Sequence, residues 1–174
     1  MIEILEVLSA LALFRAIAQD VIFATLLAGS LAFGQGPERA CSLTWLVAVY
    51  FWPEMAPAFG LAPREPVDLL AGSAVFLIID AGLFAGFALV AITANRLYVL
   101  VAAAFQLIAL IAIVLKALMV SLNPVAFVVL NVGSTWLALL TLVIGLVNHI
   151  RRQQAGLKYP DWRWQVHRPR TLAA

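Results

Sequence analysis

The sequence predicts an all-α integral membrane protein, a small antiparallel bundle of about five transmembrane helices. Of its 174 residues, 64% are hydrophobic and 11% are charged, and the mean hydropathy is +1.03. A soluble globular chain is about half apolar and about a quarter charged. The second half of the chain also contains three long apolar segments separated by short polar turns. Because such a chain cannot form a water-solvated surface, we expect a multi-pass membrane protein.

The first segment is predicted as one long helix over residues 2–33, with its span at 11–33. At 1.5 Å per residue this helix would be roughly 48 Å long, which exceeds the ~30 Å hydrocarbon core. Its first turns are therefore expected at the membrane interface. An interfacial helix followed by a short span is the alternative. Glu3 and Glu6 stand where a cleavable signal peptide needs positive charge, so we expect none.

Residues 34–39 are predicted as a turn, because glycine, proline and charged residues cluster there. The apolar stretch that follows is short, since Pro53 interrupts it. We expect a Pro-bent span over 40–60, or an interfacial or re-entrant piece. If this stretch does not cross the membrane, the bundle has four spans instead of five.

The three C-terminal helices are the clearest part of the prediction, with spans at 69–94, 97–122 and 125–150. Asn95–Arg96 and Asn123–Pro124 form the turns between them, and Pro124 suits the first position of a helix. Turns this short place consecutive helices side by side and antiparallel.

The tail, residues 151–174, contains six of the eleven basic residues of the chain. The positive-inside rule places this tail in the cytoplasm, in a protein of the bacterial inner (plasma) membrane. We expect the tail to contact anionic lipid headgroups. The residues predicted to do so are Arg151, Arg152, Lys158, Trp162, Arg163 and Trp164.

Polar residues inside the predicted spans are the candidate functional residues. A charged side chain in hydrocarbon is costly and usually paired or functional. Asp80 lies near the middle of its span, with Arg15 as its first expected partner, and Lys116 is expected to reach the headgroups. A polar face of the last helix runs from Asn131 to His149. The full set is Arg15, Asp20, Asp80, Gln106, Lys116, Asn131 and His149.

The span at 69–94 is expected to be central in the bundle. Gly82 and Gly86 have the Gly-x-x-x-Gly spacing that lets two helices approach closely, and Asp80 lies on nearly the opposite side. Protein is therefore expected on both sides of this helix.

The chain contains none of the motifs for nucleophilic, metalloprotease or phosphate-loop chemistry that we sought. We therefore expect no catalytic residue, cofactor or metal, and no nucleic-acid partner. The leading interpretation is a non-catalytic membrane subunit or scaffold that packs against itself or a larger complex. The alternative is a proton, ion or small-solute transporter or channel component that uses Asp80 and the polar face.

Overall fold

The computed structural model describes residues 2–60, 74–94, 96–118, 123–156 and 162, without the side chains of residues 2–13, 16 and 124. All regular elements in this part are helices. In chain order they are α1 (Ile2–Phe33), α2 (Gly36–Trp45), the π-helix η1 (Leu46–Phe51), α3 (Trp52–Met55), the 3-10 helix η2 (Ala56–Phe59), α4 (Ala74–Thr93), α5 (Leu97–Leu118), α6 (Pro124–Val128), the π-helix η4 (Val129–Gly133) and α7 (Ser134–Gln154).

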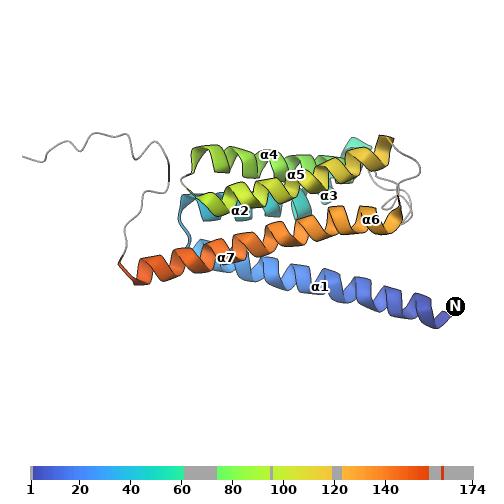
Figure 1. Ribbon diagram of the computed structural model, residues 1–174, viewed down its shortest axis with the longest axis horizontal. Coiled ribbons are helices and arrows are strands. Elements are labelled where there is room, and N and C mark those ends of the chain that lie inside the picture. The colour runs from blue at the N-terminus through green and yellow to red at the C-terminus, as the bar shows by residue number, and fades with distance from the viewer. Residues whose placement is uncertain (1, 61–73, 95, 119–122, 157–161, 163–174) are drawn as a thin grey trace, which may run out of the picture.

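The helices join into five rods that run alternately up and down (Figure 1). We call the end where α1 meets α2 and α4 meets α5 the Arg96 end, and the opposite end the Asn123 end. Within the described residues, three stretches are long and apolar enough to cross a membrane: Ala74–Thr93, Leu97–Leu118 and Val125–Gln154. The structure is thus the predicted helical bundle, with three candidate spans at its C-terminal side.

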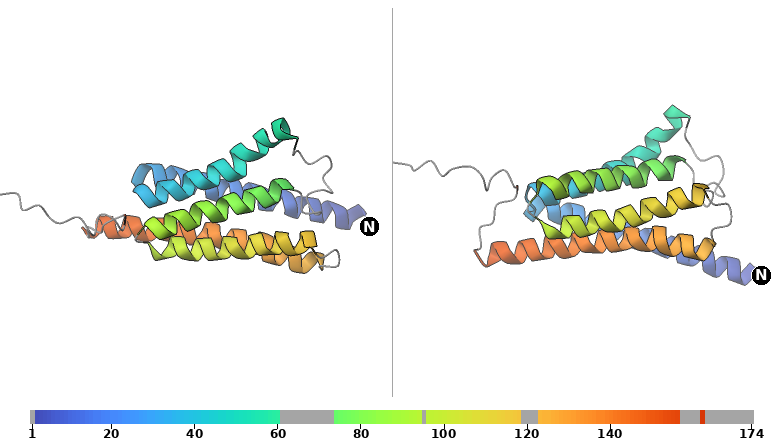
Figure 2. Two further views of the ribbon diagram at one scale, coloured as in Figure 1. Left: turned by 90° about the horizontal axis from the view of Figure 1, so that it is seen from above. Right: turned by 45° about the horizontal axis from the view of Figure 1, so that its top comes forward.

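Helix α4 lies in the middle of the bundle, as the sequence predicts. It packs against α5 on one side and against α2 and η1 on another (Figure 2). Helix α7 then packs against α5 and α1. The predicted start of the α4 span, residues 69–73, and the end of the α5 span, residues 119–122, lie outside the described residues.

Helix α1 is continuous from Ile2 to Phe33, so the long-helix interpretation is the one observed. Its N-terminal half runs away from the other helices toward the Asn123 end (Figure 1). In its second half Phe23 and Leu26 are buried in the core, whereas Phe14 is 71% exposed.

The predicted turn at residues 34–39 is wrong, because α2 already begins at Gly36. Pro37 fits the first turn of a helix, where its missing N–H has no partner to lose. The Gln35 backbone N–H donates to Glu38 Oε2 at 3.2 Å, which closes this end of the helix. The polar residues read as a loop therefore form a helix start.

The second rod continues through Pro53 by changing its helical type. Proline has no N–H and its ring collides with the carbonyl four residues earlier. The chain widens into the π-helix η1 before Pro53, and the Trp52 N–H donates to the Val47 carbonyl five residues back. The stretch predicted at 40–60 is thus a bent helical rod that ends at Phe59.

A layer of large apolar side chains fills the bundle at mid-length. Trp45, Phe87 and Leu139 are fully buried, and Leu83 is 1% exposed. The Trp45 ring stacks between Phe23 and Phe87, at centroid distances of 6.2 and 6.3 Å. This apolar layer separates two groups of buried polar residues, one toward each end.

Candidate functional site

Asp80 lies on α4 on the Asn123 side of the apolar layer, and its carboxylate is held by two amide groups. Gln106 Nε2 of α5 donates to Oδ1 at 2.8 Å, and Asn131 Nδ2 of η4 donates to Oδ2 at 2.7 Å. Asp80 is 6% exposed and Gln106 is fully buried. Three helices therefore meet at one carboxylate, and hydrogen bonds to a charged group are among the stronger ones.

The π-helix η4 places Asn131 at this site. Asn131 Nδ2 also lies 3.3 Å from the Ala109 carbonyl of α5, so the amide bridges α4 and α5. A π-turn interrupts the regular spacing of a helix, and such turns occur often at functional sites. The sequence pattern predicted Asn131 as a residue of the polar face. It did not predict the π-turn, because the pattern assumes a regular α-helix.

The amide pair around Asp80 has one unused acceptor. Gln106 Oε1 is buried and has no hydrogen-bond partner among the described residues. If Asp80 takes up a proton, rotation of the Gln106 amide brings Oε1 to the carboxyl O–H. The same side chain can then donate to the ionised acid and accept from the protonated acid.

A cavity of about 430 Å³ opens beside Asp80, between α1, the second rod, α4 and the start of the last rod. Asp80 and Asn131 form part of its wall, and Arg15, Gln19 and Thr135 bring further polar groups to it. Both π-helices contribute residues, Val49 from η1 and Asn131 from η4. A largely apolar cavity with a few polar groups thus reaches a buried acid from the side of α1.

The expected ion pairs inside the spans are not formed among the described residues. Arg15 lines the same cavity as Asp80, but the partners of Asp80 are the two amides. Asp20 accepts a hydrogen bond from the Tyr50 hydroxyl at 2.5 Å. Lys116 is only partly buried, on the last turn of α5. The hydrogen-bond partners of Asp80 among the described residues are therefore two uncharged amides.

A second polar group surrounds Glu38 at the Arg96 end. Glu38 Oε1 accepts from the Tyr98 hydroxyl at 2.8 Å and lies 3.6 Å from both Arg96 Nε and His149 Nδ1. Arg96 Nη2 lies 3.2 Å from His149 Nδ1, and Gln153 Nε2 lies 2.8 Å from His149 Nε2. The side chains of Glu38, Arg96 and His149 are at most 4% exposed. This Glu38 network joins α2, α5 and α7.

Sequence reasoning identified His149 but missed Glu38, because residues 34–39 were read as a solvated turn. Cys41, the only cysteine of the chain, is buried one helical turn beyond Glu38 and 2% exposed. The network could have been predicted from Glu38, Arg96 and His149, because each lies at a helix end and the predicted topology brings these three ends together.

Trp162 of the tail also packs at the Arg96 end. Its backbone forms an isolated antiparallel bridge with Ala94. A Cβ added to Gly36 would lie 2.6 Å from the Trp162 ring, so glycine makes room for it. Arg151 and Arg152 are exposed at the end of α7. The other predicted tail contacts, Lys158, Arg163 and Trp164, lie outside the described residues.

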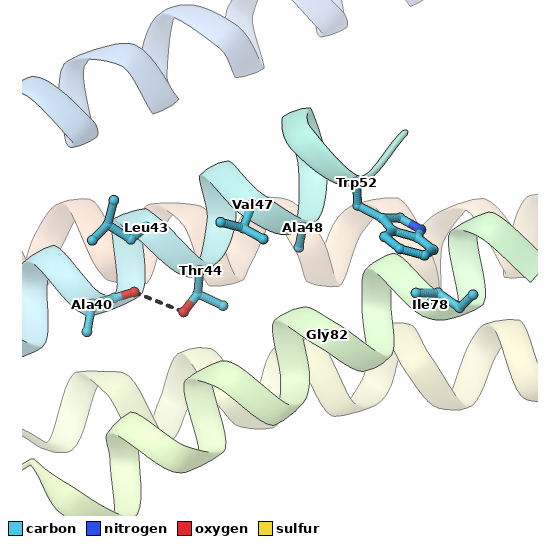
Figure 3. A pocket seen from close by; sticks show the side chains of 8 residues that line it. All are labelled: Ala40, Leu43, Thr44, Val47, Ala48, Trp52, Ile78 and Gly82. Atoms are coloured by element: carbon cyan, nitrogen blue, oxygen red, sulfur yellow. Dashed lines mark hydrogen bonds between the residues drawn. The ribbon is translucent and has the colours of Figure 1, made fainter. Parts of the chain in front are cut away.

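The two glycines of the Gly-x-x-x-Gly pair have different surroundings. A Cβ at Gly86 would overlap Thr44, so Gly86 allows α2 to pack closely against α4. Gly82 instead faces Ala48 across a groove of about 450 Å³ (Figure 3). The residues that line this groove are mostly apolar: Ala40, Leu43, Thr44, Val47, Ala48, Trp52, Ile78 and Gly82.

A scan against protein-family models and searches of the curated proteins and the solved structures found no match for this chain.

Proposed function

We propose that this chain is a component of a membrane transport system in which Asp80 takes up and releases a proton. The observation that carries the proposal is a buried carboxylate held by two neutral amides at the wall of a cavity. An acid inside a membrane bundle is costly unless it has a partner or a task. Two amides hold the acid in place without a cationic partner to keep it ionised.

A proton fits the surroundings of Asp80 better than a metal cation does. The amide nitrogens of Gln106 and Asn131 already occupy positions on both carboxylate oxygens. Each carboxylate oxygen keeps one further acceptor position. A proton needs only one such position, and Gln106 Oε1 is available to accept from the resulting O–H, whereas a metal ion needs several more ligands. The described residues contain no cluster of three metal-ligating side chains.

We propose a component of a transport system and not a complete transporter, because the described polar residues lead to Asp80 from one side of the apolar layer only. From Asp80 toward the Arg96 end, the next inward-facing residues of α4 are Leu83 and Phe87, both buried in the apolar layer. Passage across the membrane requires this layer to open or a second chain to complete the path.

The proposed membrane arrangement has five spans, with the C-terminus in the cytoplasm of a bacterial inner membrane. The excess of basic residues after Ile150 supports this orientation. The alternating direction of the five rods supports opposite sides for the two termini (Figure 1).

Proton flux in reconstituted vesicles tests the role of Asp80. We expect wild-type protein to dissipate a pH gradient and Asp80→Asn to lose about 100-fold or more of this rate, the general range for a proton-transfer group. Asp20→Asn is the matched control and should keep the rate within about 2-fold, since Asp20 is exposed and outside the amide pair.

Infrared difference spectra supply the second measurement. A protonated-carboxyl band that appears on acidification should be present in wild type and in Asp20→Asn, and absent in Asp80→Asn. Wild-type vesicles no more permeable than empty ones, or an Asp80→Asn protein as active as wild type, would contradict the proposal.

The groove beside Gly82 favours a second candidate function, the non-catalytic membrane subunit. Its small residues Ala40, Ala48 and Gly82 leave room for a helix from another membrane chain or a second copy (Figure 3). Gly82→Leu should then release a co-purifying partner or dissociate an oligomer in mild detergent. Gly133→Leu is the control, because a Cβ there meets nothing within 4 Å. A wild-type protein that purifies as a lone monomer would remove this candidate.

A further inference from the structure

A cavity of about 480 Å³ lies at the Arg96 end, between the start of α5 and the last turns of α7. Its polar lining residues are Arg96, Tyr98, Thr141, Asn148, His149 and Arg152. Leu97, Val101 and Gly145 complete the wall. Its volume lies within the range of about 300–1,000 Å³ that is usual for ligand sites.

The Glu38 network fixes the inner wall of this cavity. The Arg96 side chain is 4% exposed and is held between Glu38 and His149, at 3.6 and 3.2 Å. The Tyr98 ring packs where Gly145 has no side chain, because a Cβ at Gly145 would overlap it. The cavity therefore has a preorganised shape.

The charges around the cavity leave it positive. Glu38 offsets one guanidinium charge, that of Arg96, and Arg152 brings a second one at the rim. Within the described residues, Arg152 forms no ion pair and the Asn148 amide forms no hydrogen bond. Donors at two neighbouring turns of α7 are thus available to a ligand that carries negative oxygens.

We propose that this cavity binds the phosphate group of an anionic phospholipid. A planar guanidinium matches phosphate oxygens with paired hydrogen bonds. Arg96 and Arg152 lie at the helix ends, whereas the wall further into the bundle is formed by the uncharged residues Val101, Thr141 and Gly145. This order, with charge outside and an uncharged wall inside, suits a phospholipid at the membrane surface. The inference rests on the proposed membrane placement and is independent of the role of Asp80.

Native mass spectrometry of the full chain in detergent tests the site, with phosphatidylglycerol and phosphatidylcholine as probes. We expect wild type to retain phosphatidylglycerol in preference to phosphatidylcholine. Arg152→Gln should weaken phosphatidylglycerol binding about 10-fold, the general effect of losing a charge-assisted hydrogen bond. Arg151→Gln is the matched control with the same change of charge, and it should weaken binding less than about 2-fold because Arg151 lies outside the cavity wall.

A second variant keeps the charges and fills the cavity. Val101→Trp should reduce lipid retention while a stable, helical protein is verified by circular dichroism. Inorganic phosphate distinguishes the two sources of the anion: phosphate binding that depends on Arg152, without lipid retention, would assign the site to a soluble phosphate. Equal effects of Arg151→Gln and Arg152→Gln on phosphatidylglycerol binding would overturn the site. A wild-type protein that retains phosphatidylglycerol no better than phosphatidylcholine, and binds no inorganic phosphate, would also overturn it.

Discussion

Single residues decide how closely the helices of this bundle approach. Gly36, Gly86 and Gly145 each stand where a Cβ would meet a neighbouring side chain, respectively Trp162, Thr44 and Tyr98. Gly133 is different, because a Cβ there would meet nothing within 4 Å. Glycine in a helix costs up to about 1 kcal/mol relative to alanine. The cost is therefore offset at the first three positions by contact with another segment.

We predict that Gly145→Ala destabilises the fold by about 1–3 kcal/mol, the usual effect of an oversized side chain in a packed site. The new methyl group would displace the Tyr98 ring and weaken the bond from its hydroxyl to Glu38. Reversible unfolding in detergent measures this change. Gly133→Ala is the control and should leave stability unchanged or raise it by up to about 1 kcal/mol. The same loss in both variants would mean that helix propensity, not the Tyr98 contact, controls the effect.

At the scale of elements, the Glu38 network connects three helices that the chain supplies from distant positions. Glu38 comes from α2, Arg96 and Tyr98 from the start of α5, and His149 from α7. Removing one member leaves the remaining charges and hydroxyl buried without their partner. The network is therefore expected to hold the Arg96 end of the bundle together.

We predict that Glu38→Ala destabilises the protein by about 3–5 kcal/mol, as loss of one partner does in buried ion pairs. Unfolding in detergent again measures the difference. Glu54→Ala is the matched control, because Glu54 is exposed on α3 and should change stability by no more than about 0.5 kcal/mol. A Glu38→Ala protein as stable as this control would show that the network does not hold the helices.

The sequence predicted the order and direction of the helices because apolar length and short turns determine them. It also predicted the polar face from Asn131 to His149, and along that face Ser134, Ala138, Gly145 and His149 are buried. Two features of the structure could not be predicted from the residues that surround them in the sequence. The start of α2 looked like a loop because its polar residues, Glu38 above all, are satisfied only by distant helices. The partners of Asp80 were misjudged because opposite charge suggested Arg15, whereas the packing of α5 and η4 brings two amides closer.

For the whole molecule, the alternating rods give a direct prediction about sidedness. We expect reporters fused to the two termini to lie on opposite sides of the membrane, with the C-terminal one in the cytoplasm, because five rods are an odd number. Protease protection of tagged protein in oriented vesicles measures this arrangement. Termini on the same side would favour the four-span alternative, in which the rod from Gly36 to Phe59 does not cross.

The buried Cys41 thiol is a natural probe of helix opening at the Arg96 end. Its thiol is the only one in the chain and it is enclosed beneath the Glu38 network, in contact with the interior rather than with solvent. A thiol reagent can reach it only when the helices at the Arg96 end part. When the reagent is concentrated enough to react before the helices close again, the rate of modification equals the rate at which this end opens. Local opening costs less free energy than global unfolding. Motion at one end of the bundle can thus be timed in the unaltered protein.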